Sequence, residues 1–232
     1  MKMQRYAITD RRLLFPHPGG MEAALCNQLQ QWVAGGIEWV QIREKDLPEH
    51  MLAALARSLA AVAHGPGSST KLLVNGLRPE LARECGADGV HLPSGADAEA
   101  ICAAARDAGM VTVSCHGLQE VEVARRGGAA AVLWAPVFSK AMLRKTIDPA
   151  AGKATTQEAM PDEAIGAEPV YREVHPGSGL PALHAACLAA APMPVFALGG
   201  VSITNAPVCL EAGAAGIAGI RLFHGSTWRV LA

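Results

Sequence analysis

Long apolar runs, clusters of positive charge and paired cysteines are absent from this sequence, and aromatic residues make up only 4% of it. No uninterrupted apolar stretch reaches the roughly 18 residues that a helix needs to cross a bilayer. Residues 1–6 carry no apolar core typical of a signal peptide. A net charge of −1 without a long basic run does not suit a surface for nucleic acids. The sequence therefore predicts neither a membrane nor a nucleic-acid partner.

The six cysteines are scattered, with no CxxC pair that would indicate a metal or redox site. Most lie in Ala/Leu-rich helical patterns, where cysteine serves as a small core residue. Unpaired cysteines are typical of a reducing compartment, so we expect a cytoplasmic protein. The 232 residues, half of them hydrophobic, suit one large globular domain that spans residues 1–232.

What the sequence does have is a repeated alternation of short apolar runs with helix-like stretches. The eight runs cover residues 5–10, 38–43, 71–75, 89–92, 110–115, 130–135, 194–198 and 216–222. Gly86, Gly127 and Gly213 stand where a helix should end before the next run, and glycine allows the left-handed turn of such a joint. The pattern predicts an α/β fold, a (β/α)8 TIM barrel, with an open doubly wound sheet as the alternative.

Two segments depart from this pattern. Residues 139–173 form a long insertion after the sixth run, with several prolines and no clear periodicity. Loops of this length are often functional lids or disordered, and we expect this one to be partly mobile. Only residues 224–232 remain after the eighth run, so the last helix should be short or missing. A homodimer would cover the flank of the barrel that is left open there.

Polar residues close the second run. Gln41, Arg43 and Lys45 share one face by strict alternation. Arginine binds phosphate in a bidentate fashion and lysine binds it as a point charge, so the two cations predict a site for a small anionic phosphate ligand. The alternative is a surface ion pair with Glu44 or Asp46.

Three further runs also end in polar residues, and the carboxyl ends of parallel strands meet at one mouth of a barrel. Asn75 is either a ligand-binding residue or part of an Asn-Gly turn with Gly76. His91 is either a ligand-binding residue or a core histidine with a satisfied hydrogen bond. Ser114 and His116 share a face, as a donor pair or with His116 as a general acid or base; a capping or loop histidine is the alternative.

Glycines close the seventh run. Amides of Gly199 and Gly200, with those at the end of the eighth run near Gly219, suit the phosphate site that TIM barrels carry after strands seven and eight. Arg221 either adds positive charge to that site or points outward into a salt bridge. Carboxylates are scarce at these run ends, and the late Asp97 suits a helix N-cap.

Seven segments, in order along nearly the whole chain, resemble the thiamine phosphate synthase/TenI superfamily. They are Tyr6–Arg11, Val40–Leu47, Leu73–Asn75, Gly89–Leu92, Ala135–Phe138, Pro194–Gly200 and Ala212–Ala218. The resemblance implies a TIM barrel that binds thiazole phosphate or thiamine phosphate. In the synthase branch it implies a magnesium–pyrimidine diphosphate site and a thiazole phosphate site. The residues implied are Gln41, Arg43, Lys45 and Asn75 for the first, and the amides of Gly199 and Gly200 for the second.

Two departures make the chain more similar to the TenI branch. The synthase pattern has Asn-Asp where this chain has Asn75 and Gly76, and Gly-Gln-Glu-Asp where it has residues 93–96, so both expected magnesium carboxylates are missing. The resemblance then implies a TenI-like enzyme that acts on a thiazole phosphate, such as a thiazole tautomerase, with no metal or other cofactor. The histidine associated with that activity is Pro136 here, and His116 is the candidate substitute.

Two alternatives stay open. One is a thiamine phosphate synthase that joins a pyrimidine diphosphate to thiazole phosphate with the help of Mg²⁺. The other is a non-catalytic protein that binds thiamine or thiazole phosphates.

Overall fold

Eight parallel strands form a closed barrel in the computed structural model, which describes residues 3–14, 20–144, 157–159 and 171–231. The barrel strands are β1 (Gln4–Ile8), β2 (Trp39–Ile42), β3 (Lys71–Asn75), β4 (Gly89–Leu92), β5 (Met110–Cys115), β6 (Ala131–Trp134), β10 (Val195–Ala197) and β11 (Gly216–Gly219). β1 pairs with both β2 and β11, so the ring has no open edge. The predicted TIM barrel is confirmed, and the open doubly wound sheet is wrong.

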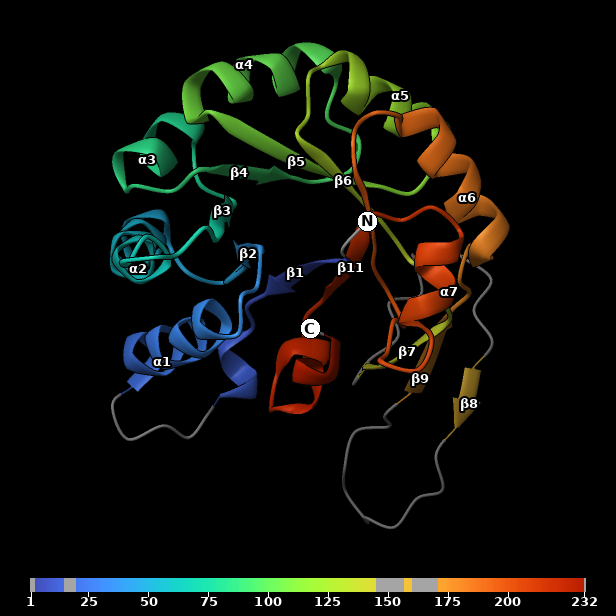
Figure 1. Cartoon of the computed structure of the whole chain (residues 1–232), viewed down its shortest axis with the longest axis horizontal. Helices are drawn as coiled ribbons and strands as arrows, with labels where there is room; N and C mark the ends of the chain where they lie inside the picture. Colours follow the sequence, from blue (N-terminus) through green and yellow to red (C-terminus); the bar gives the residue numbers. More distant parts are fainter. Residues whose placement is uncertain (1–2, 15–19, 145–156, 160–170, 232) are drawn as a thin grey trace.

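Helices form a ring around the strands (Figure 1). They are α1 (Gly20–Ala34), α2 (Glu49–Ala63), α3 (Pro79–Glu84), α4 (Ala98–Ala108), α5 (Leu118–Arg126), α6 (Gly179–Ala190) and α7 (Ala206–Glu211). One large apolar cluster joins them to the outer faces of the strands. Asp97 caps α4 as predicted, because its Oδ1 accepts a hydrogen bond of 2.7 Å from the amide of Ala100. No helix in these ranges is long and apolar enough to cross a membrane.

Aromatic side chains fill the amino-terminal half of the barrel interior. Tyr6 and Trp39 stack with ring centroids 6.0 Å apart, and Phe196 meets both rings edge-on at 5.3 and 5.6 Å. Lys71 places its Nζ over the Trp39 ring, 4.1 Å from the centroid. This floor is a packed core, so a ligand can reach the interior only from the carboxyl ends of the strands.

The insertion after β6 contains strands that the sequence pattern does not predict. β7 (Lys140–Arg144), β8 (Gln157–Ala159) and β9 (Tyr171–His175) form an antiparallel sheet in the order β7-β9-β8. It lies apart from the barrel sheet, as expected of an insertion, and the intervening residues 145–156 and 160–170 fall outside the described ranges. The interpretation of residues 1–232 as one domain stays a prediction.

Two 3-10 helices follow β11 in place of a full α-helix, as predicted: η2 (Arg221–Phe223) and η3 (Thr227–Leu231). The indole Nε1 of Trp32 on α1 donates to the carbonyl of Phe223 at 2.9 Å, and Trp228 is fully buried. Figure 1 shows these turns between α1 and α7. They cover this flank within the chain, so the flank alone does not require a second subunit; the homodimer stays a prediction.

Candidate active site

The carboxyl-end mouth begins one layer above the aromatic floor. Gln41 follows Trp39 and Asn75 follows Leu73 on the inner face, because alternate residues of a strand point the same way. The Nε2 of Gln41 donates to the Oδ1 of Asn75 at 3.3 Å. The Oε1 of Gln41 is buried and finds no partner in the described part of the chain, so it is a free acceptor. Gly76 has a φ of +84° and the chain bends there, which leaves Asn75 at the mouth.

A chain of hydrogen bonds crosses the barrel beside this pair. The hydroxyl of Tyr6 lies 3.1 Å from the Oγ1 of Thr112, which lies 2.8 Å from the Nδ1 of His91. The Nε2 of His91 lies 2.9 Å from the Oγ of Ser114. His91 is only 4% exposed, which matches the interpretation of a core histidine with satisfied hydrogen bonds. Its role in ligand binding stays a prediction.

Burial, together with the positive charges of Arg43 and Lys45, lowers the pKa of His91 to about 3. The imidazole is therefore neutral at physiological pH. A neutral ring has one nitrogen that donates and one that accepts, which matters for the direction of the hydrogen bonds around it.

This shift predicts that stability falls as the pH drops below about 6.5, where His91 of the unfolded chain takes up a proton that the folded barrel rejects. Between about pH 7 and pH 5, His91 should remove about 2 kcal/mol from the free energy of unfolding. Urea denaturation at both pH values measures the loss, which His91→Gln should reduce by about that amount. His50→Gln, at an exposed position of α2, is the control and should keep the wild-type loss. Equal losses in wild type and His91→Gln would contradict the assignment.

The acidic residues next to the predicted cations are bound by another arginine. Arg11 contacts Glu44 at 3.0 Å and Asp46 at 2.6 Å through its two terminal nitrogens. Thr9 donates its hydroxyl to Glu44 at 2.7 Å. The alternative of a surface ion pair between these acids and Arg43 or Lys45 is therefore wrong.

Arg43 and Lys45 form no ion pair within the ranges that the structure describes. The nearby Asp10 is bound by Arg12 at 2.8 Å. Arg43 is half-buried, and burial lowers its pKa. The neighbouring charge of Arg43, more than burial, lowers the pKa of Lys45. Lys45 beside the positive charge of Arg43 is stabilised by an anion, so this edge of the mouth suits one.

Gly199 and Gly200 follow β10 after one residue, Leu198, close to the strand end as predicted. Both have positive φ, +91° and +66°. A Cβ atom on Gly199 would come within 2.7 Å of Pro136, and one on Gly200 within 2.7 Å of Phe138, so both positions require glycine. Neither amide donates a hydrogen bond to another described residue, although both carbonyls accept one. Two free amides in a tight glycine turn suit a phosphate oxygen.

The end of β11 gives less support to the phosphate site. Gly219 is buried and packs against Leu222. Arg221 begins η2 and is exposed, with no ion pair in the described residues. Their roles in phosphate binding stay predictions.

His116 follows the last residue of β5 and is exposed. Its ring Nδ1 contacts the carbonyl of Ala135, and its amide donates to Glu120 at 2.6 Å. Because a carbonyl only accepts, Nδ1 carries the hydrogen and Nε2 keeps its lone pair. This arrangement orients the ring and leaves Nε2 able to accept a proton. Its catalytic role stays a prediction.

The carboxylates that the synthase pattern uses for magnesium are missing from this mouth, and the absence of a metal cofactor stays a prediction. Residue 76 is glycine, residues 93–96 supply no carboxylate, and Glu44 is buried against Arg11 and Thr9. No group of three or more metal-binding side chains lies within the described ranges. The hard oxygen ligands that Mg²⁺ prefers are therefore already bound to arginine or replaced.

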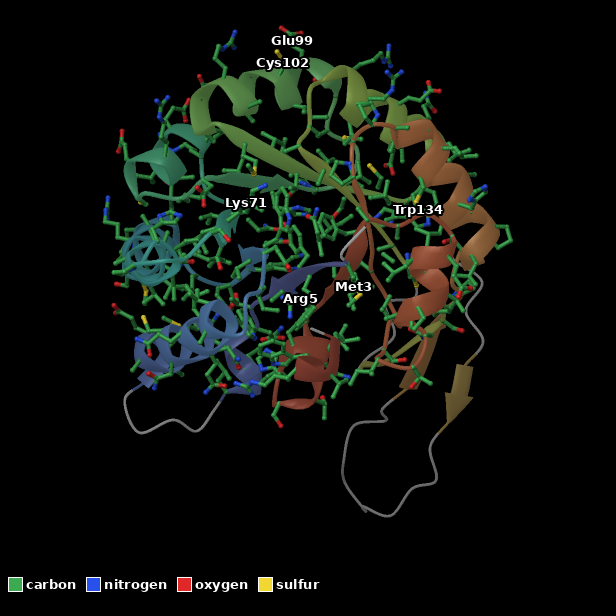
Figure 2. All side chains as sticks on the ribbon, viewed as in Figure 1. Met3, Arg5, Lys71, Glu99, Cys102 and Trp134 are labelled. Atoms are coloured by element: carbon green, nitrogen blue, oxygen red, sulfur yellow. The ribbon has the colours of Figure 1, made fainter. Side chains whose placement is uncertain are left out.

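Sequence patterns missed four residues that build the site. Thr112 and Tyr6 could have been found by alternation, since Thr112 precedes Ser114 by two residues on the same face of β5. Arg11 and Thr9 lie in the segment Tyr6–Arg11 that resembles the family, but their pairing with Glu44 had no local signal, because Glu44 lies more than thirty residues away along the chain. Glu99 and Cys102 point outward from α4, away from the barrel (Figure 2).

Comparison with known proteins adds independent findings. The model of the family described as thiamine monophosphate synthase matches residues 5–166. A protein of Geobacter sulfurreducens is 33% identical over 92% of this chain and 83% of its own length. The thiamine-phosphate synthase of Thermus thermophilus is 31% identical over 89% of this chain and 84% of its own. The solved thiamine phosphate pyrophosphorylase from Pyrococcus furiosus has a TM-score of 0.68, covering 99% of this chain and 91% of that one; at 22% identity it shows the fold.

Proposed function

The chain belongs to the thiamine monophosphate synthase family, and we propose that its barrel mouth binds a thiazole phosphate and acts on it in thiamine biosynthesis. The observation that carries the proposal is the pair of cations at the mouth that form no ion pair with any described residue. Arg11 binds both neighbouring acids, which leaves Arg43 and Lys45 for an anionic ligand. The free amides of Gly199 and Gly200 supply a second place for a phosphate group.

The remaining mouth residues would orient the heteroaromatic part of the ligand. Gln41 offers a buried acceptor, and Ser114 and Asn75 offer polar atoms at the same level. The aromatic floor beneath them excludes water from below, which strengthens each hydrogen bond and charge interaction in the mouth.

The names of the curated relatives favour one reaction, the formation of thiamine phosphate from thiazole phosphate and a pyrimidine diphosphate. In this chain Arg43 and Lys45 would neutralise the diphosphate as it leaves. The two positions where the synthase pattern has carboxylates are not acidic here, and no step through magnesium is assigned.

Those two positions favour a second reaction, a proton shift within the thiazole phosphate itself. Such a tautomerisation needs a group that gains and loses a proton near neutral pH. His116 would supply it through Nε2, the ring nitrogen that its contact with Ala135 does not use. A protein that binds the ligand without turnover is the remaining outcome.

Parallel assays of both reactions, with Mg²⁺ and with a chelator, separate these outcomes. We expect thiazole phosphate to bind in either condition and magnesium-dependent formation of thiamine phosphate to be weak or absent. Robust magnesium-dependent synthesis would establish the synthase reaction for this chain. Failure to bind thiazole phosphate in calorimetry would overturn the proposal itself.

A matched pair of variants sharpens this test. Gly76→Asp with Ala96→Asp restores the two carboxylates of the synthase pattern, and Gly76→Asn with Ala96→Asn has nearly the same shape without charge. Gly76 has open space around its Cβ position, although its positive φ adds a strain of about 1–3 kcal/mol to either variant. We expect magnesium-dependent synthesis to increase only in the aspartate variant. An increase in both, or in neither, would show that missing carboxylates are not what limits synthesis.

A further inference from the structure

Four side chains form a continuous hydrogen-bonded chain from the barrel core to the mouth. Tyr6 and Thr112 are fully buried and His91 is 4% exposed, whereas Ser114 is half-buried at the carboxyl end of β5. The two contacts of His91, 2.8 and 2.9 Å, use both of its ring nitrogens. Three of these groups are almost fully buried, and only Ser114 lies partly open to the mouth.

Only one order of donors and acceptors along this chain leaves neither buried hydroxyl hydrogen without an acceptor. The Tyr6 hydroxyl is buried, and the structure shows Thr112 as its partner, so Tyr6 donates to Thr112. The Thr112 hydrogen then has the Nδ1 of His91 as its remaining acceptor. A neutral His91 that accepts at Nδ1 carries its hydrogen on Nε2 and donates to Ser114.

We propose that the chain from Tyr6 through Thr112 and His91 fixes the Ser114 hydroxyl as a hydrogen-bond donor directed into the mouth. Because Ser114 already accepts from His91, its own hydrogen is left for a ligand atom with a lone pair. His91 is a positioning residue, and Tyr6 sets its tautomer from the floor of the barrel. The ligand part of this inference rests on the proposed function; the tautomer part does not.

Nitrogen NMR of the free protein tests the tautomer directly. In wild type, His91 should show a protonated Nε2 and an unprotonated Nδ1, unchanged between about pH 5 and pH 8. Spectra of His91→Gln identify which signals belong to this residue. In Tyr6→Phe, Thr112 can accept or donate, so both tautomers of His91 should appear. A protonated Nδ1 in wild type, or a tautomer that Tyr6→Phe leaves unchanged, would overturn the proposal.

Ligand affinity tests the donor role, with thiazole phosphate as the probe. Ser114→Ala should weaken binding by about 3- to 10-fold, the usual effect of losing one neutral hydrogen bond. His91→Gln keeps a donor toward Ser114 and should bind within about 2-fold of wild type, whereas His91→Leu should weaken binding as much as Ser114→Ala. Equal binding by His91→Leu and wild type would overturn the donor role. If wild type itself does not bind thiazole phosphate, the proposed function fails. The tautomer result still decides whether the hydrogen bonds from Tyr6 to Ser114 run in the proposed direction.

Discussion

Replacing His116 with alanine is expected to lower the turnover of a thiazole phosphate proton shift by about 10²- to 10⁴-fold, the usual contribution of a positioned acid or base. Affinity for the thiazole phosphate should change much less, because the charged contacts of Arg43 and Lys45 remain. The loss of turnover is expected because the Nδ1 of His116 contacts the carbonyl of Ala135, which leaves Nε2 as the ring nitrogen available for proton transfer. Single-turnover rates and calorimetry on the same preparations separate the two quantities.

His184 provides a matched control for this substitution. It is exposed on α6, and its Nδ1 also contacts a carbonyl, that of Ala212 at 3.1 Å. His184→Ala removes a histidine with the same kind of backbone contact away from the strand ends, so it should keep wild-type turnover. Full activity in His116→Ala would defeat the catalytic assignment and favour a binding role.

The second large effect is expected from Arg43→Ala, which should weaken binding of thiazole phosphate or a diphosphate by about 1–3 kcal/mol. Arg43 is half-buried and free of ion pairs in the described part of the chain, so its loss leaves the ligand charge without a forked donor. Arg43→Lys keeps the positive charge but not the forked donor geometry, so its affinity should lie between those of wild type and Arg43→Ala. Calorimetric titration at fixed salt concentration measures all three proteins.

Arg78→Ala is the control for charge alone. Arg78 is exposed and pairs with Glu49 at 2.8 Å, at the start of α2 and α3. The Arg78→Ala substitution removes the same positive charge from the protein. We expect its affinity for thiazole phosphate to stay within about 2-fold of wild type, since exposed ion pairs contribute little. Unchanged affinity in Arg43→Ala would remove Arg43 from the site.

Alternation and glycine placement were enough to predict the barrel and the inner face of its strands. Gln41, Asn75 and Ser114 lie at the mouth because residues two apart on a strand share a face, whatever the rest of the chain does. The strands β7 to β9 were not predicted, since the insertion has neither a period of two nor one of 3.6. Their pairing joins residues far apart in sequence, which local patterns do not report.

Charge pairing was the part of the site that sequence could not resolve. Glu44 and Asp46 flank the predicted cations, and adjacency alone made an ion pair with them a fair alternative. The fold instead brings Arg11 from β1's carboxyl end to both acids. The lowered pKa of His91 likewise depends on burial and on the charges of Arg43 and Lys45, which lie far from His91 in the sequence.

A structure of this chain with thiazole phosphate bound would show whether the barrel mouth is the ligand site. We expect the ligand at the carboxyl-end mouth, with its phosphate on the Gly199 and Gly200 amides or on Arg43 and Lys45, and its ring beside Ser114. A ligand bound elsewhere on the barrel, or a mouth that stays empty at saturating thiazole phosphate, would contradict this expectation.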